Sequence, residues 1–126
     1  MAKQIISTTD APAAIGTYSQ AVRVGNTIWV SGQIPLDPLT KELVSAQIEP
    51  QVRQTFANLR AIVGAAGARM DDVVKVTIFL IDLAHFALVN KVMAEYFPEP
   101  FPARAAVGVA SLPRGAQVEV ECIIAL

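Results

Sequence analysis

The sequence predicts an α/β (α+β) fold in which strands and helices follow the order β-β-β-α-β-α-β-β, with both helices on one face of a single sheet. Two stretches carry apolar residues at helical spacing, and several shorter apolar stretches have the length and composition of strands. Gly and Pro residues separate these stretches. Because the chain has 126 residues, one domain covering residues 1–126 is expected.

The N-terminal part of the chain predicts strands. A short apolar segment, Gln4–Ser7, precedes a turn-rich stretch. Gln20–Val24, Gly25-Asn26 and Thr27–Gln33 then form a hairpin signature, because Gly and Asn supply the positive φ angles that a two-residue turn requires. Two prolines interrupt the next segment, so Leu36–Ala46 is expected to be a loop with at most a short strand.

The first helix is predicted from Pro50, a residue favoured at the first helical position. Apolar residues then recur at spacings of four and three, which places them on one face of a helix. Gly67 is the natural stop. The residues of this apolar face are Val52, Phe56, Leu59, Val63 and Ala66.

The second half of the chain alternates between the two types of structure. Val73–Ile81 predicts a strand, and Leu83–Phe97 a helix that Pro98 ends. Ala103–Ala110 and Ala116–Ala125 predict the last two strands. The final strand alternates, with aliphatic residues on one side and two glutamates among those on the other.

The predicted sheet is apolar on both of its faces. Two helices can cover only one face, yet Val73–Ile81 is apolar on both sides, as strands buried on both faces are. The uncovered face is therefore expected to pack against another subunit. The apolar share of 53% is higher than in an ordinary soluble domain, which fits this expectation. A tightly packed monomer core would produce the same surplus of apolar residues.

Composition excludes several classes of protein. The net charge is −1 and no run of Lys or Arg exists, so nucleic acid is not an expected partner. The single cysteine, Cys122, allows no intrachain disulfide and is expected to be a small buried apolar residue. With no signal core and no apolar run near the ~20 residues of a membrane span, no membrane association and a cytoplasmic location are expected.

The sequence offers little for metal or nucleophilic chemistry. It contains one histidine, His85, and one cysteine, whereas a zinc site needs three or four converging ligands. His85 opens the second predicted helix, where a solvent-exposed or capping role is expected. A Ser/His/Asp or Cys/His system lacks a second candidate base, and no glycine-rich phosphate loop follows a strand. No metal and no cofactor are expected.

Polar residues within the last two strands are the remaining candidates. If Leu112–Gly115 forms a hairpin turn, antiparallel pairing places Arg104 across from Glu119–Ile123. The pair can be an ordinary cross-strand ion pair, or a site where Arg104 holds a small carboxylate and Glu119 takes a proton from water. Tyr18 and Ser31, near strand ends, are further polar groups with either a structural or a binding role.

Several segments resemble one known family in order and spacing across nearly the whole chain. Pro102–Val107, Leu112-Pro113 and Val118–Glu121 closely resemble the signature of the reactive intermediate deaminase family (Rid, or YjgF), in its RidA branch. Ala11–Gly16 followed by Tyr18 and Gln20, Val30–Pro35, and Phe86–Asn90 agree with the same family.

The resemblance implies a chorismate-mutase-like fold and a barrel-like homotrimer with three clefts between subunits. It also implies hydrolysis of 2-iminobutanoate, 2-iminopropanoate and similar products of pyridoxal-phosphate enzymes, which is metabolite damage control. Arg104 matches the family's carboxylate-binding arginine and Glu119 its water-positioning acid. Ala106 stands where many members have cysteine, which leaves its backbone N–H as the useful group. The other matching cleft residues are Tyr18, Ser31, Gly32 and Asn90.

Three functions remain for comparison. The first is the deaminase, whose partners are small 2-imino and 2-keto acids. The second is a non-catalytic trimer that binds the same acids in a regulatory role, which Glu119 disfavours because a carboxylate receptor gains nothing from a second anion. The third is an RNA-directed activity ascribed to some members of the family, which the charge balance disfavours.

Overall fold

One six-stranded sheet, in the order β1-β2-β3-β6-β4-β5, organises the computed structural model, which describes residues 2–126. The observed elements follow the predicted β-β-β-α-β-α-β-β order, and short 3-10 turns flank the later ones. The bounds are β1 Gln4–Ile6, β2 Ala21–Val24, β3 Thr27–Gln33, α1 Ile48–Ala65, β4 Val73–Leu80, α2 Phe86–Tyr96, β5 Ala103–Gly108 and β6 Val118–Ala125.

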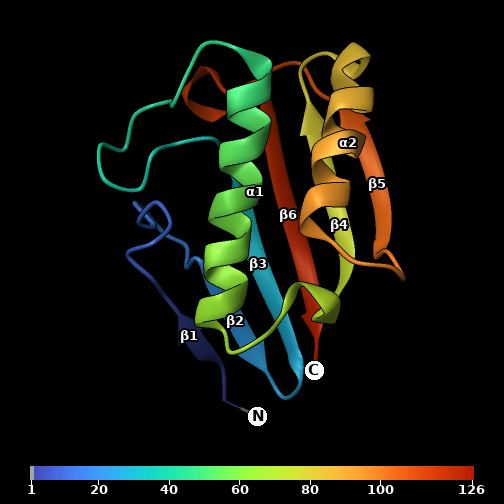
Figure 1. Cartoon of the computed structure of the whole chain (residues 1–126). Coiled ribbons are helices and arrows are strands. Elements are labelled where there is room, and N and C mark those ends of the chain that lie inside the picture. The colour runs from blue at the N-terminus through green and yellow to red at the C-terminus, as the bar shows by residue number, and fades with distance from the viewer. Residues whose placement is uncertain (1) are drawn as a thin grey trace.

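Both helices lie on the same side of the sheet, as predicted (Figure 1). Helix α1 contacts β3 and β6, and α2 packs beside α1. The ring of Phe56, fully buried on α1, lies 5.7 Å from the ring of Tyr96 and 6.2 Å from that of Phe97, measured between centroids. Aromatic contact therefore joins the two helices over the aliphatic core.

The predicted hairpin is confirmed, with one correction at its turn. Strands β2 and β3 pair in antiparallel register, Ala21 opposite Val30, and Gly25-Asn26 connects them. Gly25 has a φ of 60°, but Asn26 is not among the residues with positive φ. The glycine alone therefore supplies the left-handed conformation that the turn requires.

The predicted helices are confirmed with shifted ends. Helix α1 begins at Ile48, two residues before Pro50, and ends just before Gly67, whose φ is 76°. The range predicted for the second helix divides into a 3-10 turn, Leu83–His85, and α2. An Asp82 carboxylate oxygen accepts a hydrogen bond from the Ala84 N–H at 2.9 Å, which closes that turn.

The predicted hairpin between the last two strands is wrong. Strand β5 pairs in parallel with β4, and β6 lies between β3 and β4, antiparallel to both. Helix α2 is a crossover connection, and such connections join parallel neighbouring strands. The segment from 109 to 117 then carries the chain past β4, so that β6 enters the centre of the sheet and β5 is left at its edge (Figure 1).

The two faces of the sheet differ in what they bury. On β6, the aliphatic alternation is confirmed: Val118, Val120, Cys122 and Ile124 are buried. Burial raises the pKa of the Cys122 thiol to about 12, as expected for a cysteine that serves as core. Within residues 2–126, no helix covers the opposite face (Figure 1), which exposes large apolar side chains, including Trp29, which is 46% exposed, and Val107, which is 42% exposed.

Three further features bear on the class of protein. His85 is half-buried at the N-terminus of α2 and its side chain makes no capping hydrogen bond, so neither role predicted for it is observed. Within residues 2–126, no three His, Cys, Asp or Glu side chains lie close enough together to hold a metal ion. In the same residues, neither helix is long and apolar enough to span a membrane.

Candidate active site

A bulge in the sheet places the carboxylate of Glu119 against the backbone of Gly32. The register between β3 and β6 shifts between Val30 and Gln33, and Gly32 lies in that irregularity. A Cβ atom on Gly32 would lie 2.2 Å from Oε2 and 2.8 Å from Cδ of Glu119. Only glycine leaves room for this carboxylate, and bulges often direct side chains in this way beside active sites.

The surroundings of Glu119 favour its protonated form. Burial raises the pKa of its carboxyl group, and the nearby charge of Glu121 raises it further. Within residues 2–126, Glu119 takes part in no ion pair. A partly desolvated carboxylate without a cation beside it is a good proton acceptor, because its pKa moves towards neutrality.

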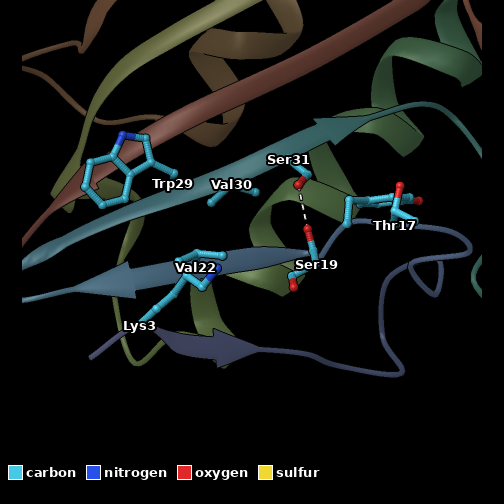
Figure 2. Close-up of a pocket in the computed structure, with 8 residues that line it drawn as sticks. Lys3, Thr17, Ser19, Val22, Trp29, Val30 and Ser31 are labelled. Carbon is cyan, nitrogen blue, oxygen red and sulfur yellow. Dashed lines mark hydrogen bonds between the residues drawn. The ribbon is translucent and has the colours of Figure 1, made fainter. Parts of the chain in front are cut away.

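Glu119 lines a cleft of about 600 Å³ at the end of β3, called the Glu119 cleft below. Tyr18, Ser31 and Gly32, three of the predicted site residues, line the same cleft. Tyr18 and Ser31 also line a neighbouring hollow of about 510 Å³ beside Trp29 (Figure 2). The Ser31 hydroxyl donates a hydrogen bond to the carbonyl of Ser19, which leaves its lone pairs free to accept.

Buried amides hold the walls of this cleft. The Gln20 side chain donates to the carbonyl of Pro12 at 2.8 Å, and that of Asn58 donates to the carbonyls of Ile34 and Leu36 at 3.2 and 3.0 Å. Asn58 was not predicted from the sequence. A signal exists, because Asn58 follows Gln51 and Thr55 at helical spacing, as a polar stripe beside the apolar face of α1.

Arg104 lies in a second pocket, of about 400 Å³, on the α2 side of edge strand β5. Its Nη1 atom donates to the side-chain oxygen of Asn90 at 2.7 Å and lies 3.8 Å from the sulfur of Met93. Its guanidinium carbon lies 4.7 Å from the centre of the Phe86 ring. The stacking and the hydrogen bond fix the guanidinium plane and leave most of its five N–H groups free for a ligand.

The two pockets lie on opposite sides of the sheet, so the prediction that Arg104 lies across from Glu119 is wrong. Arg104 pairs with Val76, whose side chain is buried under the helices, whereas Glu119 pairs with Phe79 on the uncovered face. Within residues 2–126, Arg104 and Glu119 therefore form neither a cross-strand ion pair nor a shared site. Ala106 follows Arg104 on the same side of β5, exposed, and lines neither pocket.

The fold and these groups define the class of protein. A fixed guanidinium suits a carboxylate, and a desolvated carboxyl group beside a cleft suits proton transfer. This is a small α+β protein with a fixed guanidinium in one pocket and a partly desolvated carboxyl group in another. The chain belongs to the family described as endoribonuclease L-PSP, whose model matches residues 8–126, and the resemblance to RidA proteins is confirmed.

Relatives agree over nearly the full length of the chain. The 2-iminobutanoate/2-iminopropanoate deaminase of Dermatophagoides farinae is 52% identical, over 98% of this chain and 97% of its own. The crystal structure of RidA from an Antarctic Psychrobacter is 51% identical with a TM-score of 0.94, covering 98% and 99%. Escherichia coli TdcF with bound serine is 41% identical with a TM-score of 0.92, covering 98% of each chain.

Proposed function

We propose that this protein hydrolyses 2-imino acids, including 2-iminobutanoate and 2-iminopropanoate, to 2-keto acids and ammonia. The active site combines the Glu119 cleft of one copy with the Arg104 pocket of the next copy in a homotrimer. The observation that carries the proposal is that a fixed guanidinium and a partly desolvated carboxyl group lie on opposite sides of one sheet, each beside a hollow. Relatives about half identical to this chain are named for this reaction.

The uncovered sheet face supports association of several copies. Trp29, Val74 and Val107 are each more than 40% exposed there, although such side chains belong in a core. Arg104 lies on the edge strand and is itself exposed, so a neighbouring copy can approach it. Packing the uncovered faces together buries the apolar groups and brings the edge of one sheet towards the cleft of the next.

In this site, Arg104 binds the carboxylate of the substrate. The guanidinium presents two parallel N–H groups to two carboxylate oxygens, and a fork of this kind sets the orientation as well as the position of the ligand. Because Asn90 and Phe86 already fix the guanidinium, little side-chain entropy is lost on binding. The bound serine of TdcF, a small molecule with a carboxylate, is consistent with this role.

Glu119 activates water. Its carboxylate accepts a proton from water as the oxygen forms a bond to C2 and the C=N double bond becomes a single bond. Glu119 then returns the proton to the nitrogen, which gives a neutral carbinolamine. As the C=O bond forms and the C–N bond breaks, the carboxylate of Glu119 accepts the hydroxyl proton and transfers it to the departing nitrogen, which leaves as ammonia. The net reaction consumes one imine and one water and yields one keto acid and one ammonia. General base catalysis typically contributes about 10²–10⁴-fold.

The other predicted residues complete the site. The Ser31 hydroxyl, which already donates to the Ser19 carbonyl, accepts a hydrogen bond from the imine nitrogen or the water. Tyr18 borders the same cleft with its hydroxyl available, and Gly32 makes room for the carboxylate of Glu119. The backbone N–H of Ala106 adds a donor beside Arg104 on the edge strand.

The test is release of 2-oxobutanoate from 2-iminobutanoate generated in place by threonine dehydratase. The wild-type protein is expected to accelerate release above the uncatalysed rate, and Arg104→Ala is expected to abolish the acceleration. Arg69→Ala is the matched control, because its guanidinium is on the surface beside Asp71. Near-wild-type turnover by Arg104→Ala would refute the carboxylate clamp. Binding of 2-oxobutanoate without accelerated release would favour the non-catalytic function.

A further inference from the structure

Arg114 is a basic residue at the Glu119 cleft for which the proposed reaction has no use. It lies in the turn Pro113–Gly115 that leads into β6, and its backbone has a φ of 61°. Its Nη2 atom donates to the carbonyl of Lys41 at 3.2 Å, and Lys41 has a φ of 62°. Apart from glycines, these are the two positive φ angles in residues 2–126.

The backbone conformation at Arg114 disfavours any side chain. In the left-handed region the Cβ atom lies too close to the carbonyl oxygen, so glycine is the usual residue there. A long cationic side chain in such a conformation suggests that the side chain is needed at that place.

The position of Arg114 indicates what it can bind. Within residues 2–126, it is the only basic residue that lines the Glu119 cleft, and it forms no ion pair with an acidic side chain. One hydrogen bond to a carbonyl uses one of its five N–H donors. The lining that Glu119 and Arg114 share includes the apolar side chains of Ile34, Leu36 and Pro113. The exposed guanidinium is therefore available to an anion that enters along an apolar wall.

We infer that Arg114 is a second anion-binding group of the active site and that it favours 2-imino acids whose side chain ends in a carboxylate. The inference rests on the proposed function for its account of how the substrate lies. Arg104 of a neighbouring copy holds the first carboxylate, and C2 lies beside Glu119. The substrate's side chain then follows the apolar lining of the cleft, and its terminal carboxylate meets Arg114.

Stable keto acid products provide a test that needs no turnover. The affinities of 2-oxoglutarate and of uncharged 2-oxopentanoate are measured by titration calorimetry with wild type, Arg114→Met and Arg114→Gly. The glycine variant suits the left-handed backbone and protects the test from misfolding. We expect both variants to lower the ratio of the two affinities, 2-oxoglutarate over 2-oxopentanoate, by about tenfold, since a charge-assisted hydrogen bond is lost.

Arg23→Met is the matched control, because Arg23 also donates to a backbone carbonyl, that of Gly25 at 2.8 Å, but lies outside the cleft. It should leave the ratio of affinities as in wild type. An unchanged ratio in both Arg114 variants would overturn the inference. So would an equal fall in the ratio with Arg23→Met, because the effect would then come from net charge.

Kinetics separate this inference from the proposed function. An amino acid oxidase generates the 2-imino acids of glutamate, norvaline and arginine. Wild type is expected to prefer the imino acid of glutamate, and Arg114→Glu is expected to prefer that of arginine. Discrimination in binding without any accelerated hydrolysis would refute the proposed function and leave the second anion site supported. Accelerated hydrolysis of every imine without any change in preference in Arg114→Glu would refute the second anion site alone.

Discussion

The two pockets of this chain are built in opposite ways. In the Arg104 pocket, the functional group is held by neighbours from α2, through the amide of Asn90 and the ring of Phe86. In the Glu119 cleft, the functional group has no partner within residues 2–126, and the surrounding walls are held instead, by the buried amides of Gln20 and Asn58.

This difference fits the roles proposed for Arg104 and Glu119. A clamp binds best when its orientation is fixed before the ligand arrives. A base works best when nothing competes for its lone pairs and its pKa is close to the working pH. Neither pocket holds both functions, and the sheet separates them. The comparison therefore predicts that one chain is half of an active site and that a neighbouring copy completes it.

The largest effect is expected from subunit complementation. Arg104→Ala and Glu119→Gln should each lower kcat/KM by about 10²–10³-fold, the cost of losing one partner of a desolvated charged pair or the base. When equal amounts of the two variants are unfolded together and reassembled at random, about three quarters of the trimers contain both variants. Each of these mixed trimers has one intact site of three. Activity should recover to about one quarter of wild type.

The control is the double variant, which carries both changes in one chain. It is mixed with wild type in equal amounts and reassembled in the same way. If Arg104 and Glu119 acted within a single chain, mixing the two single variants would recover nothing above the sum of their separate rates. Steady-state keto acid release measures both cases.

The next largest effect is expected on kcat, from the addition of one methyl group at Gly32 in the Glu119 cleft. Gly32→Ala places a Cβ atom where the Glu119 carboxylate lies, so the carboxylate must move. Displacement of a base by about 1 Å can cost about 10²-fold in rate, and we expect kcat to fall by 10- to 100-fold. Gly64→Ala is the matched control, because a Cβ there meets nothing within 4 Å. Equal rates in the two variants would show that Gly32 does not position the base.

Much of the fold follows from local patterns, whereas the pairing of the last strands does not. The glycine turn, the helical stripe of Val52 and Phe56, and the alternation in β6 are each encoded within a dozen residues. The position of β6 depends on competition between β3, β4 and β5 for the same edges. Sequential neighbours usually pair, and here the crossover through α2 places β5 beside β4.

The candidate site shows the same limit. Arg104, Glu119, Tyr18 and Ser31 stand out in the sequence as polar residues in or near apolar strands, whereas Gly32, Asn90 and Ala106 follow only from the resemblance to a family. The structure divides them between two pockets: Tyr18, Ser31, Gly32 and Glu119 line one, Asn90 and Arg104 line the other, and Ala106 lines neither. Alternation along a strand shows which of its residues share a face. It does not show which residues of the neighbouring strand lie on that same face of the sheet. That relation needs the register, which only the assembled sheet provides.

A moderate effect on the stability of the folded chain is expected from the carboxyl group of Glu119. Because the pKa of Glu119 is raised in the folded chain, ionisation is harder there than in the unfolded chain. Folding therefore loses stability as pH rises from the unfolded pKa through the folded pKa. Glu119→Gln should raise Tm at neutral pH while removing activity, and the gain should vanish in acid, where both states are protonated. Thermal unfolding across pH measures this, and a lower Tm at neutral pH would contradict it.

The smallest effect is expected in the core, at the buried side of α1. Thr55 is fully buried, and its Oγ1 atom has no hydrogen-bond partner within residues 2–126. Thr55→Val keeps the shape and removes the unpaired hydroxyl, so the free energy of unfolding should rise by about 1 kcal/mol with kcat/KM unchanged. Val52→Thr, at a fully buried position on the same helix, is the reverse control and should destabilise by a similar amount. Urea unfolding measures both, and a loss of stability in Thr55→Val would mean that the hydroxyl is hydrogen-bonded, since an unpaired group cannot stabilise the core that buries it.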